Sequence, residues 1–435
     1  MAISSAEIKK VLDLIKGDEL VDLAVTMGNI DSPAGHEEKM GNFLFDWLKH
    51  HGFEPKKFQV APGRDNVVAV LKGTGNGRSL ILNAHMETEM TPDENRWAMA
   101  NPEEAVPRAW ADGNRVFGRC VLNDRGCMAA FMIACKAIKE SGVKLAGDLI
   151  QTMVIGEIGM SPVDEFQGGR YWGKGVGTSN LVAHGVWADY AVVCETTDFG
   201  VTWIEAGAAY FKITAKGRAE YTPRSTRTSN LKDHPNAIVK IARVIQAIEE
   251  WGAKYEIGNS REYPPGKLVP KVTVAAVRGG VPCRPNRTSG ICSIYVDVRI
   301  PPHREILDVK RELEGVLSRL DLDLDLEMFM SRKGLVGKNS EPLVEAITKC
   351  LKEVTGQGLG TIPTEEMSMW RDINVFNAVG IPSVTFGPPR RILKNPGEEE
   401  RQGSTDPGGK TKYFDREDLV NAAKIYARLA LDMCG

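Results

Sequence analysis

Four residues of the types that bind metals each follow a short apolar run. His85 ends "SLILNAH", Asp124 follows "GRCVLN", Glu157 follows "IQTMVIG" and Glu195 ends "ADYAVVCE". An imidazole and several carboxylates that converge suit a Zn, Mn or Co ion, and a shared carboxylate allows two ions about 3.5–4 Å apart. Each residue alone is more often a cap, an ion-pair partner or a buried hydrogen-bonded group. The prediction of a site therefore depends on whether the fold brings the four together.

Helical and strand patterns alternate over the first 200 residues. Residues 5–28 and 36–51 have helical periodicity, and "GCMAAFMIACKAIKESG" is a helix with a glycine just past its end. "NVVAVLKG", "SLILNAH", "GDLIQTMVIG" and "ADYAVVCET" are near-continuous apolar strands, as in a sheet covered on both faces. In such α/β sheets ligands bind beyond the carboxyl ends of the strands. The four candidate residues occupy those ends.

A change of pattern predicts an insert over residues 207–304. The strands "GAAYFKITAKG", "KVTVAAVRGG" and "SGICSIYVDVRI" and one long helix indicate a small α+β domain with antiparallel pairing. After the insert, a helix, the strand "SVTF" and a closing helix resume the alternating helix and strand pattern of the first 200 residues. We therefore expect a discontinuous larger domain over 1–206 and 305–435.

Composition narrows the class of protein. The 435 residues are 42% hydrophobic with a formal net charge of −2 and have no long basic block, which argues against nucleic acid as a partner. No apolar stretch approaches the roughly 20 residues of a membrane span, and the pattern of the N-terminus predicts an amphipathic helix rather than a signal peptide. The eight cysteines contain no CxxC pair and are interpreted as reduced core residues. A cytoplasmic protein is expected.

The order of these motifs resembles a known family, the co-catalytic metallohydrolases that include acetylornithine deacetylase, succinyl-diaminopimelate desuccinylase, aminoacylase and glutamate carboxypeptidase. The resemblance runs from "DSPAGHEE" through "NAHMETE", "GRCVLNDRG", "GEIG" and "YVDVR" to "AVGIPSVTFGP". It implies a zinc-peptidase-like mixed sheet flanked by helices, with a lid or dimerisation insert. It also implies that His85 and Glu195 hold one metal, Asp124 bridges and Glu157 holds the second. Glu87 then orients His85.

The chain departs from the family pattern at two functional positions. The family has Glu-Glu where this chain has Gly156 and Glu157, so the usual general base is missing. The last histidine is His303, so the family's C-terminal ligand is missing too, and the matching region offers Lys412 or Tyr413. We therefore expect one firmly bound ion and a second site that is weak or absent.

Three functions remain open. The first is a metal-dependent hydrolase of a C–N bond in which Glu157, or else Asp164 or Glu165, takes the proton from a metal-activated water. The second is a hydrolytic deaminase of an activated aromatic amine, by analogy with 5-nitroanthranilate aminohydrolase. The third is a binding protein that keeps the fold without the chemistry.

The substrate is expected to be a small molecule with a carboxylate. By resemblance, Asn286 and Arg299 of the insert match residues that grip a substrate carboxylate, and the Arg371 and Arg390 guanidinium groups suit carboxylate or nitro oxygens. Arg299 has the alternative of an ion pair with Asp297. The resemblance also implies a homodimer or larger homo-oligomer.

Overall fold

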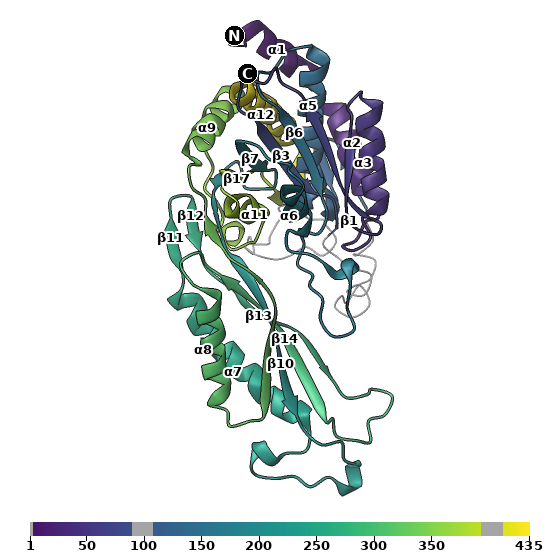
Figure 1. Cartoon of the computed structure of the whole chain (residues 1–435), viewed down its shortest axis with the longest axis vertical. Coiled ribbons are helices and arrows are strands. Elements are labelled where there is room, and N and C mark those ends of the chain that lie inside the picture. The colour runs from purple at the N-terminus through teal and green to yellow at the C-terminus, as the bar shows by residue number, and fades with distance from the viewer. Residues whose placement is uncertain (1–2, 89–107, 393–411) are drawn as a thin grey trace. The chain divides into compact units, whose positions relative to one another are not determined.

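The computed structural model describes residues 3–88, 108–392 and 412–435, and they form two compact units (Figure 1). The first unit consists of Met1–Trp203, Gly337–Ile362 and Arg371–Gly435. The second consists of Ile204–Val336 and Pro363–Trp370. The chain thus enters the second unit twice, and the first unit is discontinuous.

A seven-stranded mixed sheet forms the centre of the first unit. Its strand order is β1 (Lys56–Ala61), β2 (Arg64–Leu71), β6 (Leu149–Val154), β3 (Leu80–His85), β7 (Tyr190–Val193), β17 (Ser383–Phe386) and β8 (Val201–Thr202). The four central strands, β6, β3, β7 and β17, are mutually parallel. Their carboxyl ends therefore meet at one edge of the sheet.

Helices cover both faces of this sheet, which explains its continuous apolar strands. The helices of the unit are α1 (Ser5–Leu14), α2 (Gly17–Gly28), α3 (Glu38–His50), α5 (Gly126–Ser141), α6 (Val176–Ala183), α9 (Glu341–Thr355), α11 (Ile373–Ala378) and α12 (Arg416–Cys434). One core packs α1, α2, α5, α9 and α12 on one face, and a smaller core packs α6 and α11 on the other. The predicted mixed α/β fold is confirmed.

Two details of the helices differ from expectation or refine it. The helix expected over residues 5–28 is two helices, because Ile15 and Lys16 have extended backbone. α5 ends at Gly142, whose φ of +75° is the left-handed conformation that glycine adopts readily. Within the described ranges no helix combines the length and hydrophobicity that a membrane span requires.

Small strands complete the first unit. They form a sheet in the order β18 (Arg391–Ile392), β19 (Lys412–Asp415), β5 (Arg115–Phe117) and β4 (Trp110–Asp112).

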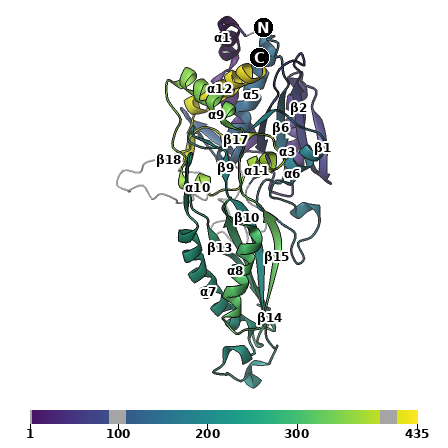
Figure 2. The same ribbon diagram turned by 60° about the vertical axis from the view of Figure 1, so that its left-hand side comes forward.

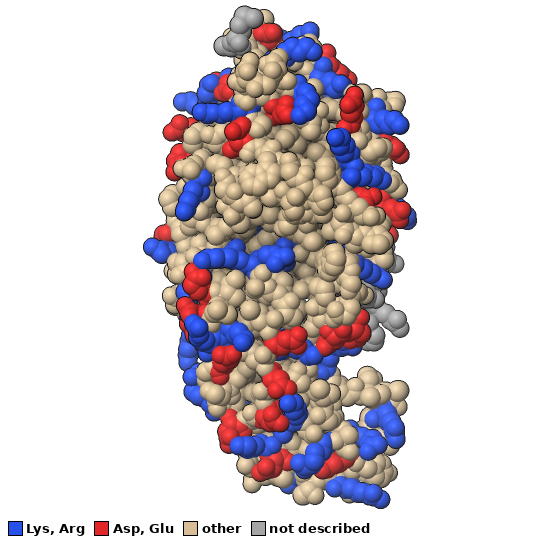
Figure 3. Space-filling view, in the orientation of Figure 1, with Lys and Arg blue, Asp and Glu red and all other residues tan. Residues whose placement is uncertain are grey.

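Seven of the eight free cysteines are buried and Cys283 is exposed, in keeping with their interpretation as core residues. On the face drawn in Figure 3 basic and acidic side chains are interspersed, as expected for a formal net charge of −2.

The second unit is an antiparallel sheet packed against two helices (Figure 2). The strand order is β13 (Val272–Gly279), β14 (Ile291–Ile300), β10 (Gly207–Lys216) and β15 (Leu324–Arg332), and the helices are α7 (Ala237–Gly258) and α8 (Ile306–Ser318). The unit also contains β9 (Ile204–Glu205), β11 (Arg261–Tyr263), β12 (Gly266–Leu268), β16 (Leu335–Val336), the short α10 (Thr364–Met367) and two 3-10 turns at Thr222–Arg224 and Leu231–Asp233. This is the predicted small α+β insert.

The insert extends further than residue 304, where the sequence placed its end. The reason is that β15 pairs with β10 from Ala208 to Ala215, and α8 contributes Val309, Leu313 and Leu317 to the core of the second unit. Residues 305–336 therefore belong to the insert and not to the larger unit. Its role as a lid or dimerisation domain stays a prediction.

Candidate metal centre

Three of the four candidate residues converge at the carboxyl edge of the central sheet. His85 is the last residue of β3, Glu195 lies two residues after β7, and Asp124 lies in the turn before α5. One donor atom from each lies within 4.8 Å of the others. All three residues are less than a tenth exposed. The geometry suits one cation held by one nitrogen and two carboxylates.

The surroundings of these residues fit a positive ion. His85 Nδ1, Glu87 Oε2 and Asp124 Oδ2 are buried and make no hydrogen bond within the described residues. Burial is the largest influence on the His85 pKa and lowers it, yet the negative charges of Glu87, Asp124, Glu157 and Glu195 together raise that pKa to about 10. Burial, followed by the charge of Glu195, raises the pKa of Asp124 well above its usual range. These buried carboxylates favour a cation among them.

Glu87 connects the histidine to the loop that follows β6. Its Oε2 lies 3.8 Å from His85 Nδ1. Its Oε1 accepts hydrogen bonds from the backbone N–H groups of Glu157 at 2.6 Å and Ile158 at 3.0 Å. One fully buried carboxylate thus contacts both the imidazole and the loop that carries Glu157.

Glu157 lies close to the three converging residues but outside that group of donors. Burial raises its pKa most, and the charge of Glu195 raises it further, to about 8, against the opposing effects of His85 and Lys174. A buried carboxyl with a pKa near neutrality beside a candidate metal site suits proton transfer.

A family model described as "Peptidase family M20/M25/M40" matches residues 81–432, which include every residue of this centre. The chain belongs to this family. The family's members hydrolyse C–N bonds, including non-peptide amides, with divalent metal ions. The predicted resemblance and the predicted class of enzyme are thereby confirmed.

Individual relatives span different substrates. The N-formyl-4-amino-5-aminomethyl-2-methylpyrimidine deformylase of Bacillus subtilis is 27% identical over 315 residues, 70% of this chain and 68% of that protein. The fold is similar to that of a di-peptidase from Saccharomyces cerevisiae, at a TM-score of 0.69 and 12% identity over 99% of each chain. It is also similar to a Bacillus subtilis protein described as a dinuclear metal-binding peptidase, at a TM-score of 0.58 and 14% identity over 96% of this chain and 98% of the other.

The position of the missing family base has no room for a side chain. Gly156 has a φ of +68°, and a Cβ there would lie 2.5 Å from Val176 Cγ1 and 3.0 Å from the Trp172 carbonyl oxygen. The Gly156 carbonyl accepts hydrogen bonds from the N–H groups of Gly175 and Val176. The acidic residue closest in sequence to the position of the missing base is therefore Glu157.

Replacing Gly156 by alanine is expected to lower the free energy of unfolding by about 2–4 kcal/mol, the sum of left-handed strain and overpacking. Denaturant unfolding measures the loss. The matched control is Gly142→Ala, where φ is +75° but nothing lies within 4 Å of the added Cβ, so about 1–2 kcal/mol is expected from strain alone. Equal losses in the two variants would contradict the steric account.

Two further buried charged residues, Arg371 and Asp372, belong to the centre. Arg371 Nε donates to Glu195 Oε2 at 2.5 Å. Asp372 Oδ2 accepts from Thr178 Oγ1 at 2.6 Å and from Asn83 Nδ2 at 3.2 Å. Burial, opposed by these two hydrogen bonds, raises the pKa of Asp372 to about 6. Sequence reasoning placed Arg371 on the substrate and did not find Asp372, whose only signal was its place directly after Arg371.

The other predicted substrate-binding residues are Arg299, Asn286 and Arg390. Arg299, in the second unit, makes the alternative ion pair with Asp297, at 3.0 Å. It lines a pocket of about 350 Å³ with Lys271 and Thr273, whereas Asn286 is exposed and is not among the lining residues. Arg390 follows β17 and is half-buried. Their roles in substrate binding stay predictions.

Asp164 and Glu165 were the alternative candidates for the base, and Tyr413 was one of the two substitutes for the missing histidine. Asp164 and Glu165 are exposed in the turn between Val163 and Phe166, which makes Glu157 the buried acid of the three. Tyr413 lies on β19, and its ring contacts the ring of Phe117. The Arg115 guanidinium carbon lies 5.1 Å from the centre of the Tyr413 ring.

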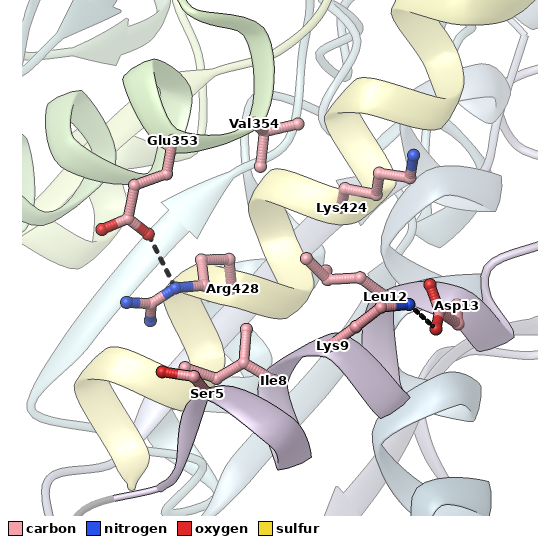
Figure 4. Close-up of a pocket in the computed structure, with 9 residues that line it drawn as sticks. All are labelled: Ser5, Ile8, Lys9, Leu12, Asp13, Glu353, Val354, Lys424 and Arg428. Atoms are coloured by element: carbon pink, nitrogen blue, oxygen red, sulfur yellow. Dashed lines mark hydrogen bonds and ion pairs between the residues drawn. The ribbon is translucent and has the colours of Figure 1, made fainter.

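A larger pocket of about 540 Å³ lies among α1, α9 and α12 (Figure 4). Ile8, Leu12 and Val354 supply its apolar part. Among its charged residues, Lys9 pairs with Asp13 on the same helix and Arg428 of α12 pairs with Glu353 of α9. No candidate site residue lines it, so it is separate from the metal centre.

Proposed function

We propose that the chain is a hydrolase with one firmly bound Zn, Mn or Co ion, held by His85, Asp124 and Glu195, that cleaves a C–N bond of a small carboxylate-bearing molecule. The convergence of three buried donors within 4.8 Å carries this assignment. Membership of the family supports the class of reaction.

When bound, the ion supplies a water of lowered pKa and polarises the scissile carbonyl group. Glu157 would accept a proton on its carboxylate and pass it to the leaving nitrogen. The Glu87 carboxylate accepts a hydrogen bond from the backbone N–H group of Glu157 and so fixes the position of the base. Exclusion of bulk water from these buried side chains strengthens each of the interactions.

The substrate class follows from the predicted anion contacts and from the relatives. Arg299, which also pairs with Asp297, is the group to which we assign the substrate carboxylate, in a pocket that the basic Lys271 and the acidic Asp297 and Glu365 line as well. The deformylase of Bacillus subtilis is named for a small N-formyl compound, which favours compact N-acyl groups over long peptides. The working form in this proposal is a cytoplasmic homodimer or larger homo-oligomer.

The test is a substrate screen with metal-loaded protein. N-formyl and N-acetyl amino acids are compared with the matching compounds whose carboxylate is replaced by a primary amide. Metal-dependent turnover that prefers the carboxylates, lost with a chelator and restored by Mn, Zn or Co, is the expected result. Turnover of 5-nitroanthranilate instead would favour the deaminase, and metal-free protein that binds a ligand without turnover would favour a binding protein.

A further inference from the structure

A permanent positive charge already lies against one of the candidate ligands. The Arg371 side chain is about 2% exposed, and its Nε donates to Glu195 Oε2 at 2.5 Å. Asp124, the candidate bridging residue, also interacts electrostatically with Arg371. Arginine stays charged at every pH at which proteins are folded. The centre therefore contains one fixed cation before any ion binds.

The backbone at Arg371 is held by its own carbonyl group and by contacts of the next residue. Its carbonyl accepts from the Asn374 N–H group at 3.1 Å in the first turn of α11. The next residue, Asp372, is fixed by the side chains of Asn83 on β3 and Thr178 on α6. The sheet and two helices thus place the guanidinium against Glu195.

A guanidinium in this place competes with a second metal ion. It occupies an oxygen of Glu195 and repels further positive charge from the same group of carboxylates. Acidic oxygens for another ion are nonetheless present, because Glu157 lies nearby and Asp372 Oδ1 is buried without a hydrogen-bond partner within the described residues. The cation, as well as the lost histidine, therefore opposes a second ion.

We propose that Arg371 is a built-in cation of the centre, which takes the place of a second metal ion and limits the site to one. Because this role rests on the proposed metal centre, its test must also show whether the first ion binds. The dinuclear relative from Bacillus subtilis shows that two ions can occupy a protein of this fold.

The experiment compares the wild type with Arg371→Gln and Arg371→Lys by metal content per chain and by titration calorimetry with Mn and with Zn. We expect about one ion per chain for the wild type and for Arg371→Lys, which keeps the charge. We expect about two for Arg371→Gln. The matched control is Arg428→Gln, which removes a buried arginine paired with Glu353 and Asp432 outside the centre and should leave the count at about one.

A second readout covers the case in which Arg371→Gln is unstable without metal. The rise of the melting temperature with the logarithm of metal concentration steepens with the number of ions bound to the folded state, so the slope should be about twice that of the wild type. One ion in Arg371→Gln with an unchanged titration curve, or loss of the first ion, would overturn the role of Arg371. Two ions in the wild type would overturn it as well. No ion in the wild type would instead refute the metal centre.

Discussion

Replacing Glu157 by glutamine is expected to lower kcat by about 100- to 10,000-fold, the usual contribution of a general acid–base group. The amide is similar in size to the carboxyl but cannot take up the proton. The ion stays bound, because Glu157 lies outside the group formed by His85, Asp124 and Glu195. Steady-state kinetics and metal analysis of the same preparation measure both effects.

The control for Glu157 is Glu165→Gln, the same change at an exposed acid a few residues further along the chain. It should alter kcat by less than about twofold, as expected for a group that does not transfer the proton. If Glu157→Gln strips the metal and Glu165→Gln loses activity, the base has been assigned to the wrong residue.

Replacing His85 by alanine is expected to weaken ion binding by more than about 100-fold. Even changes to groups that only orient a ligand cost about 10- to 100-fold in affinity, and His85 is the one nitrogen donor in the converging group. Activity at limiting metal should fall in parallel. Calorimetric titration with Mn and Zn, followed by an assay at each metal concentration, measures the two losses.

The control for His85 is His184→Ala, at an exposed residue of the same unit just after α6. It should bind metal and turn over substrate like the wild type. A His85→Ala protein with full metal content and full activity would remove the basis for the whole centre.

The positions of His85, Glu157 and Glu195 close to strand ends were predictable because they follow local rules. Apolar runs marked β3, β6 and β7, and parallel strands bring their carboxyl ends to one edge. For Asp124 the rule was wrong, because "GRCVLN" does not form a strand and Asp124 lies in a helical turn directly before α5. The sequence also showed that residue 156 is a glycine and not the family's base. It did not show that a side chain there would collide with Val176, because that contact depends on how α6 packs against the loop.

Contacts between distant segments were not predictable. Arg371 meets Glu195 across 176 residues of chain, and Asp372 meets Asn83 across 289. No periodicity encodes such pairings, so the contact of Arg371 with Glu195 was not foreseen and Asp372 was missed. The end of the insert was placed too early for a similar reason, since nothing local in β15 shows that its partner is β10.

Metal content per chain tests the central claim most directly. Protein purified without chelator is analysed for bound elements and then titrated with Mn, Zn and Co at fixed pH. One firmly bound ion per chain, with a second that binds weakly or not at all, is the result that the geometry of His85, Asp124 and Glu195 predicts. Failure of all three metals to bind would contradict it.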